Sequence, residues 1–229
     1  MRAFRSKYPG TCANCREGYA IDDYIAYVST KEVYHFDCRP TAGEQDPDKF
    51  VQDGYLFTDT ETGGTEKQSC ALIQVAVIVT DNNFLIKDFW DGLICPPKNL
   101  VITERATEIH GWTREMLANE RPEAEVIEEY LGFCRQFPNH RIAGQNVSYD
   151  LGMLEAAYER NRISAAGAYL QPAYDTLDIA RRKLQKKTAN HKLGTLAAYF
   201  GFNADAAHDA LCDLFLNVQV ARQLEVVAV

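Results

Sequence analysis

Two acidic residues interrupt an otherwise apolar pair of segments near the first quarter of the chain. The stretch 58–64 reads TDTETGG; residues 54–57 before it and 70–79 after it have the β-branched and aromatic character of strands. Alternate residues of a strand share a face, so Asp59 and Glu61 are expected side by side. Neighbouring carboxylates repel unless a cation lies between them, and oxygen ligands suit Mg²⁺ or Mn²⁺. The alternative is a charged hairpin tip exposed to water.

Two later segments carry further acidic residues and a histidine. Asp150 is predicted just inside a helix that follows Asn146, and His208 stands five residues before Asp213 on an apolar, Leu- and Ala-rich helix. An aspartate facing the sheet from such a helix would need a cation. Taken alone, Asp213 could instead be an exposed helix residue. His208 could be an ordinary helix N-terminal residue, although Asp209 fits that position better.

The ordered motifs D-x-E, N-x3-D and H-x4-D resemble those of the DEDDh family of 3′→5′ exonucleases, which are DnaQ-like members of the ribonuclease H-like superfamily. The resemblance covers roughly residues 53–225. It implies two Mg²⁺ or Mn²⁺ ions held by the carboxylates of the motifs, and a histidine that acts as general base. The implied ligands are Asp59, Glu61, Asp150 and Asp213, and the implied base is His208.

The resemblance also implies contacts to the terminal nucleotide. Thr62, Gly63 and Gly64 would let backbone N–H groups approach it closely, and His110 is a further candidate contact. Gly63 departs from the family pattern, because many relatives have a second threonine there. A basic run spans residues 181–187 and either contacts phosphates or is a solvated helix end, whereas His191 is expected to be a core or surface filler.

Residues 1–39 are predicted to form a separate module. Cys12, Cys15, His35 and Cys38 make two closely spaced pairs of metal-type ligands. A unit this small cannot bury a sufficient core alone, and one structural Zn²⁺ would supply folding energy. The alternatives are free thiols or a bridge between the first two cysteines. Residues 40–52 are polar with Pro and Gly and are predicted to be a linker, which leaves residues 53–229 as the exonuclease-like domain.

The order of predicted elements in that domain is βββαβαβα when consecutive helices are counted together. Strands are expected at 54–57, 70–79, 84–94, 141–144 and 172–175, and helices at 103–110, 122–136, around Asp150, from Thr176 and around Asp213. This order is typical of an α/β fold of the ribonuclease H-like class. The expectation is a mixed five-stranded sheet flanked by helices and preceded by the small zinc-binding module.

The composition limits the class of protein and the cellular compartment that we expect. The 229 residues contain seven cysteines, an odd number that argues against a disulfide framework, and no apolar run is long enough to span a membrane. No signal-peptide core follows the start, so a cytoplasmic protein without a membrane partner is expected. The net charge of −8 is unhelpful for a nucleic-acid binder that relies on its overall field, but bound cations would offset part of it.

Two function classes follow. The first is an enzyme that releases nucleoside 5′-monophosphates from the 3′ end of DNA or RNA, acting on single strands or on the 3′ ends of duplexes. The second is a scaffold that uses a nuclease-like domain for binding in a polymerase or repair complex. A scaffold has no need for a buried carboxylate cluster, which favours the enzyme.

Overall fold

The chain forms two compact units, Met1–Gln52 and Asp53–Val229. The computed structural model describes residues 2–6, 9–12, 16–21, 23–29, 32–35, 52–203 and 209–227. The predicted linker therefore lies almost entirely outside the described residues. Among the described helices, none combines the length and the apolar character needed to cross a bilayer.

The first unit is built from short antiparallel strands. They are β1 (Arg2–Arg5), β2 (Gly10–Thr11), β3 (Gly18–Tyr19), β4 (Tyr24–Ser29) and β5 (Glu32–His35). Strands β1, β4 and β5 form one sheet, and β2 pairs with β3. Cys12 follows β2 and is fully buried, and its backbone N–H donates to the carbonyl of Glu17 at 2.9 Å. Cys15 and Cys38 lie outside the described residues, so the zinc site stays a prediction.

The second unit contains a six-stranded mixed sheet in the order β11-β10-β6-β7-β8-β9. Its strands are β6 (Gly54–Thr62), β7 (Leu72–Asp81), β8 (Ile86–Cys95), β9 (Arg121–Pro122), β10 (His140–Gly144) and β11 (Leu170–Asp175). Strands β6, β7 and β8 form an antiparallel meander, whereas β10 is parallel to both β6 and β11. The predicted mixed sheet is confirmed.

The sheet has one strand more than the five that were predicted. The additional strand, β9, pairs in parallel with the end of β8 through Ile94↔Arg121 and Cys95↔Pro122. Proline lacks a backbone N–H, which an edge strand tolerates. Residue 122 was expected inside the following helix, but it instead precedes that helix as its N-cap residue.

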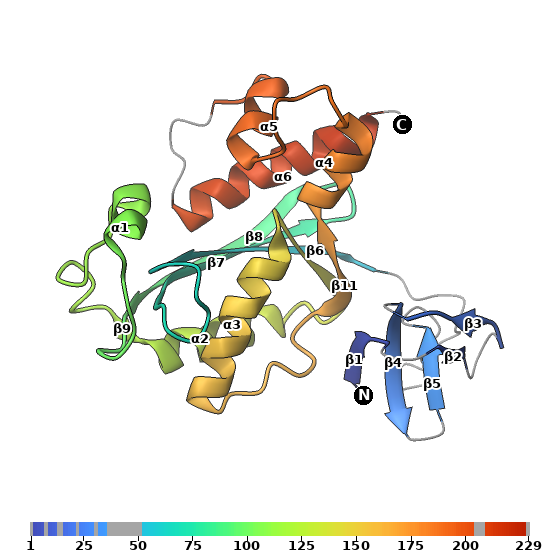
Figure 1. Ribbon diagram of the computed structural model, residues 1–229, viewed down its shortest axis with the longest axis horizontal. Coiled ribbons are helices and arrows are strands. Elements are labelled where there is room, and N and C mark those ends of the chain that lie inside the picture. The colour runs from blue at the N-terminus through green and yellow to red at the C-terminus, as the bar shows by residue number, and fades with distance from the viewer. Residues whose placement is uncertain are drawn as a thin grey trace. The chain divides into compact units, whose positions relative to one another are not determined.

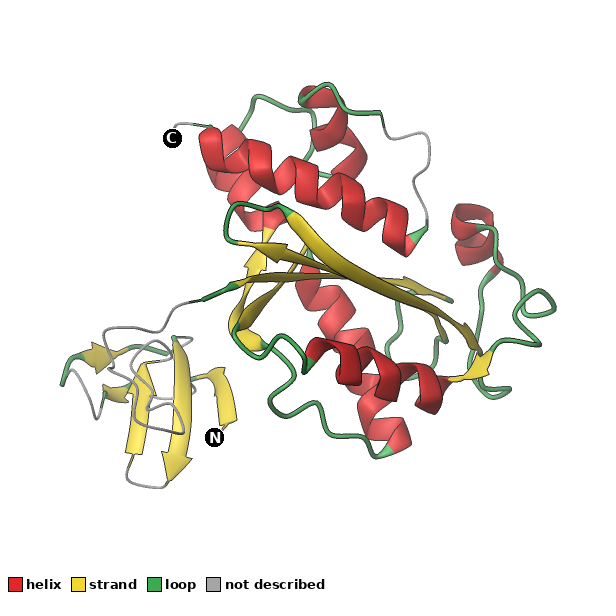
Figure 2. Ribbon diagram, turned by 180° about the vertical axis from the view of Figure 1, so that it is seen from behind, coloured by secondary structure: helices red, strands yellow, loops and turns green. Residues whose placement is uncertain are grey.

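Helices cover both faces of the sheet, as Figures 1 and 2 show from opposite sides. They are α1 (Glu104–His110), α2 (Glu123–Cys134), α3 (Val147–Asn161), α4 (Thr176–Leu184), α5 (Leu193–Tyr199) and α6 (Ala210–Val226). Helices α2 and α3 pack on one face through the larger apolar core. Helix α6 packs on the other face, and α4 and α5 pack against α6.

Strand β6 is longer than the sequence indicated. The two acids were expected at the end of the strand, but its pairing with β7 continues through Asp59↔Ala76 and Glu61↔Gln74 to Thr62, so both acids lie well within it. The ladder hydrogen bonds with the buried strand β7 keep Asp59 and Glu61 in the strand although acidic residues are depleted there, and the threonines between them favour strand structure. The two acids therefore occupy a central strand of the sheet.

Candidate active site

The alternation of side chains along β6 separates two chemistries. Threonines at positions 58, 60 and 62 are buried on the α2–α3 face, and each hydroxyl contacts one helix side chain. The pairs are Thr58 with Tyr130 at 2.7 Å, Thr60 with Asp150 at 2.7 Å and Thr62 with Tyr149 at 2.8 Å. Asp59 and Glu61 fall between these threonines and share the opposite, α6-facing side with Phe57. The threonines thus anchor the strand while the acids face α6.

Helix α6 brings a third carboxylate to this pair. Asp213 lies in its first turn, and Leu214 packs in the core between the helix and the sheet. Carboxylate oxygens of Asp59, Glu61 and Asp213 all lie within 4.8 Å of one another. Three oxygen donors at this spacing fit a divalent cation that prefers hard ligands, such as Mg²⁺ or Mn²⁺.

Asp150 approaches the cluster from α3. Its side chain is 3% exposed, and its Oδ1 accepts hydrogen bonds from the backbone N–H of Thr60 at 3.0 Å and from the hydroxyl of Thr60 at 2.7 Å. Thr60 thus fixes the position of the Asp150 carboxylate. Three of the four predicted carboxylate ligands lie within 4.8 Å of one another, and Asp150 is close enough for its charge to raise the pKa of Asp59.

The electrostatics of the cluster show how strongly it is crowded. Burial, followed by the charge of Asp150, raises the pKa of Asp59 well above its ordinary value. Burial and the charge of Asp213 raise the pKa of Glu61 to about 7. Burial also raises the pKa of Asp150 to about 7, although the Thr60 hydrogen bonds oppose the shift. Carboxylates that resist ionisation in this way are stabilised as anions by a bound cation.

A glutamine fixes the start of α6 against the sheet. Gln74 lies opposite Glu61 on β7 and is 2% exposed. Its Nε2 donates to Asp209 at 3.2 Å and its Oε1 accepts from the backbone N–H of Ala210 at 3.1 Å. Asp209 in turn caps α6 by accepting from the N–H of Cys212 at 3.1 Å. This network sets the position from which Asp213 reaches the other carboxylates.

The predicted general base, His208, lies outside the described residues. It immediately precedes Asp209, which occupies the N-cap position of α6. The expectation that Asp209 suits the helix-capping position better than His208 is confirmed. The capping role is thereby filled without the histidine.

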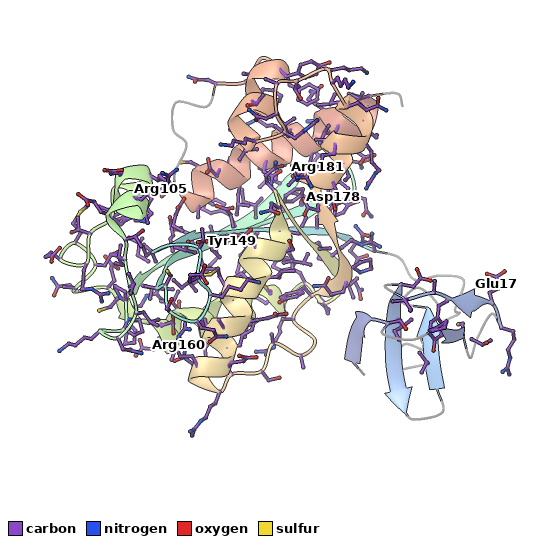
Figure 3. All side chains as sticks on the ribbon, in the orientation of Figure 1. Glu17, Arg105, Tyr149, Arg160, Asp178 and Arg181 are labelled. Atoms are coloured by element: carbon purple, nitrogen blue, oxygen red, sulfur yellow. The ribbon has the colours of Figure 1, made fainter. Side chains whose placement is uncertain are left out.

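A pocket of about 430 Å³ opens beside Glu61. It lies among the end of β6, helix α1 and the first turn of α3. The lining residues are Thr60, Glu61, Thr62, Gly64, Thr65, Thr103, Arg105, Ala106, Ile109, His110 and Tyr149. Figure 3 labels Arg105 on α1 and Tyr149 on α3. The pocket combines apolar surface with hydroxyls, a guanidinium and an imidazole, which suits a base and a sugar.

Three groups close one wall of this pocket. The hydroxyls of Thr62 and Tyr149 lie 2.8 Å apart, and each lies close to the carbonyl oxygen of Gly64, at 3.1 Å and 3.0 Å respectively. Helix α1, on the other side, is capped by Thr103 as its sequence predicted. The backbone N–H of Trp112 donates to Nδ1 of His110 at 3.0 Å, so the neutral ring carries its proton on Nε2.

Gly63 takes a different part from the one expected of it. Its N–H donates to the carbonyl of Ala71 at 2.8 Å, its carbonyl accepts from the N–H of Thr103 at 2.8 Å, and it does not line the pocket. A Cβ on this residue would lie 2.2 Å from the carbonyl oxygen of Val101. Glycine is therefore required for the close approach of two backbone segments, and its N–H is engaged within the fold.

Four contributors to the site were not identified from the sequence. Thr60 and Tyr149 each stand directly beside a predicted ligand, and Gln74 is a lone polar residue in an apolar strand; these positions were available signals. Arg105 carries no such local signal, because α1 reaches the site only through the tertiary fold.

Solved structures share this architecture. Exonuclease I of E. coli in complex with a dA16 oligonucleotide superposes with a TM-score of 0.68 at 22% identity, covering 76% of this chain and 41% of that one. Exonuclease I of Methylocaldum szegediense gives a TM-score of 0.65 at 23% identity, covering 75% of this chain and 40% of that one. The fold is thus the ribonuclease H-like α/β fold of exonucleases.

Sequence comparison places the chain within a family. The exonuclease family (RNase_T) matches residues 56–221, and the chain belongs to this family. PolC-type DNA polymerase III of Latilactobacillus sakei is 31% identical over 159 residues, which are 69% of this chain and 10% of that protein. The corresponding protein of Streptococcus thermophilus is 30% identical over the same length. The chain therefore spans about a tenth of the length of these curated relatives.

Proposed function

We propose that this chain is a metal-dependent 3′→5′ exonuclease that releases nucleoside 5′-monophosphates from DNA or RNA. The observation that carries the proposal is the convergence of Asp59, Glu61 and Asp213, whose oxygens lie within 4.8 Å of one another, next to a pocket of about 430 Å³. A carboxylate cluster and a pocket for one nucleotide are the two parts that terminal hydrolysis requires.

Different residues of the site would bind the metal ions, orient the nucleotide and accept a proton. The carboxylates of β6, α3 and α6 would hold two Mg²⁺ or Mn²⁺ ions, which when bound activate water and stabilise charge on the phosphate. Thr62, Gly64, His110 and Tyr149 orient the terminal nucleotide, while Gly63 shapes the backbone beneath it. His208, next to the N-cap of α6, accepts the proton of the attacking water on an imidazole nitrogen.

Single-stranded DNA, RNA and duplex DNA, each labelled at the 5′ end, distinguish the possible activities. With Mg²⁺, the labelled strand should shorten stepwise from its 3′ end, and nucleoside 5′-monophosphate should appear; chelation should stop both. Asp213→Ala should abolish cleavage, and His208→Ala should lower the rate by about 10²–10⁴. Asp88→Ala, an exposed aspartate of β8, is the matched control and should retain activity.

Immediate release of the label as a mononucleotide would reverse the assigned direction. Tight binding of the oligonucleotides without cleavage under any divalent cation would instead favour the scaffold. PolC-type polymerases among the relatives make a polymerase complex the first partner to test in that case.

A further inference from the structure

A second pocket lies on the other side of the first turn of α3. It has a volume of about 590 Å³ and forms where the loop between β10 and α3 meets α4 and the segment before α5. Its polar lining consists of Gln145, Asn146, Arg181, Asn190, His191 and Lys192. No acidic side chain is among the described residues that line it, although the whole chain carries a net charge of −8.

The cations of this pocket are available to a ligand. Among the acidic residues of the described chain, Arg181 forms an ion pair only with Asp178, with an N–O distance of 3.5 Å. Both side chains are well exposed, so solvent screens this pair. Lys183, two residues further along α4, instead donates to the carbonyl of Leu224 at 2.8 Å near the end of α6. The basic run of α4 is thus divided, and Arg181 is the member that joins Lys192 at the pocket.

Hydrogen bonds preorganise the neutral lining. Gln145 Nε2 donates to the carbonyl of His191 at 2.7 Å, and its Oε1 accepts from the hydroxyl of Thr176 at 2.6 Å. Asn190 Oδ1 accepts from the N–H of Lys192 at 3.0 Å. The Nε2 atom of His191 is buried and has no partner among the described residues. A buried nitrogen of this kind normally has a water or a ligand as its partner.

The position of the pocket relates it to the proposed substrate. Tyr149 lines the first pocket, Asn146 lines the second, and Asp150 of the carboxylate cluster lies in the same helical turn. In Figure 3, Arg105, Tyr149 and Arg181 follow one another from α1 through α3 to α4. A strand whose terminal nucleotide fills the first pocket can continue past Asp150 toward the second.

We propose that the second pocket binds a backbone phosphate of the nucleic-acid strand, on the 5′ side of the scissile bond. This inference rests on the proposed function. Arg181 and Lys192 supply the charge, and His191 and Asn190 supply hydrogen bonds that do not read the base. The pocket would therefore strengthen binding of longer strands without sequence preference.

Direct binding measures the contribution of the pocket. In an Asp213→Ala background, which prevents cleavage, the Kd of a fluorescent single strand long enough to reach both pockets is measured over a range of salt concentrations. Adding Arg181→Ala and Lys192→Ala should raise the Kd roughly tenfold. The slope of the logarithm of the binding constant against the logarithm of salt concentration should become shallower by about 0.7 for each phosphate that the variant no longer neutralises. Arg182→Ala with Lys186→Ala removes the same charge outside the pocket and should change the Kd much less.

Cleavage separates the pocket from the catalytic centre. The measured quantity is kcat/KM for the long strand divided by kcat/KM for a nitrophenyl ester of thymidine 5′-monophosphate, which reaches only the first pocket. The Arg181→Ala, Lys192→Ala variant should lower this ratio, and Arg181→Gln with Lys192→Gln repeats the test if the first variant does not fold.

Equal effects of the pocket and control variants on the Kd would overturn the inference, as would failure of the Asp213→Ala protein to bind the long strand. If the wild-type chain cleaves neither the long strand nor the nitrophenyl ester, the proposed hydrolysis is wrong. The binding comparison in the Asp213→Ala background still decides whether the second pocket binds a phosphate.

Discussion

Individual carboxylates of the cluster lower the stability of the folded chain when they are ionised. Glu61 and Asp59 are held beside Asp213 on a central strand, where burial disfavours their charged forms. The folded chain therefore binds protons at these residues more tightly than the unfolded chain does. Such a site is poised for cations, because cation binding relieves the same repulsion.

This arrangement predicts a specific pH dependence. Because the pKa of Glu61 rises from 4.5 to about 7 on folding, its contribution to stability is largest below pH 4.5 and is lost as the pH rises toward 7. In chelator, the unfolding temperature of the wild-type chain should fall over this range relative to Glu61→Gln. Mg²⁺ should reduce the fall.

The exposed Glu129→Gln variant is the control and should follow the wild-type curve. Parallel curves for wild type and Glu61→Gln in chelator would show that Glu61 does not titrate with a raised pKa.

Gln74 is expected to act through Asp213 and not on the substrate. Gln74→Ala leaves the buried N–H of Ala210 without its acceptor, which should cost about 1–3 kcal/mol of unfolding free energy. It should also weaken Mg²⁺ binding roughly 10–100-fold, as the removal of a group that orients a ligand does. Denaturant unfolding and Mg²⁺ titration of cleavage measure the two effects.

Gln219→Ala, on the exposed side of α6, is the matched control and should change neither quantity appreciably. If the cleavage rate of Gln74→Ala depends on Mg²⁺ concentration as the wild-type rate does, Gln74 does not position Asp213.

At the scale of elements, helices α2 and α3 are joined by a partly buried ion pair. Glu123, 3% exposed at the start of α2, accepts hydrogen bonds from Arg160 at 2.9 and 2.8 Å and from Asn161 at 2.7 Å, near the end of α3. The pair fixes α3, and with it Asp150, relative to the sheet.

Breaking this pair should be costly. Glu123→Ala leaves the guanidinium of Arg160, whose side chain is 20% exposed, without its partner and should lower the unfolding free energy by about 1–3 kcal/mol. Replacing both residues with methionine should recover much of that stability. Glu129→Ala removes an exposed pair with Arg121 and should cost no more than about 1 kcal/mol. A similar destabilisation in the two alanine variants, measured by denaturant unfolding, would contradict this account.

Local pattern predicted most elements of the second unit but not their extents or contacts. The apolar strand around Val75 and the helix capped by Thr103 follow from alternation and capping, which are local properties. The extent of β6 was underestimated: the two acids were expected at the end of the strand, whereas its ladder with β7 continues through Thr62. The pairing of Asp59 and Glu61 was predicted from their spacing, whereas the roles of Asp150 and Asp213 were predicted from the resemblance of the ordered motifs to an exonuclease family. The roles of Gln74 and Arg105 depend on tertiary packing, which spacing does not report.

For the whole molecule, the two units differ in how much apolar core their described residues form. The second has extensive apolar cores on both faces of its sheet, whereas the first consists of short strands. The 229-residue protein, purified without chelator, should contain about one Zn²⁺ per chain if Cys12, Cys15, His35 and Cys38 form a closed site. Elemental analysis measures it.

Cys12→Ser with Cys15→Ser should abolish the zinc content, whereas Cys212→Ser, an exposed cysteine of α6, should leave it unchanged. Metal-free wild-type protein with an unaltered unfolding curve would exclude the site.

The carboxylates come from widely separated parts of the chain: Asp59 and Glu61 from β6, Asp150 from α3 and Asp213 from α6. During synthesis on the ribosome, the first pair emerges about 150 residues before the last ligand, at typical rates several seconds or more earlier. Until α6 has docked, the nascent chain lacks a complete cluster. A nascent chain that has not yet exposed α6 would thus lack the complete metal site that the proposed hydrolysis requires.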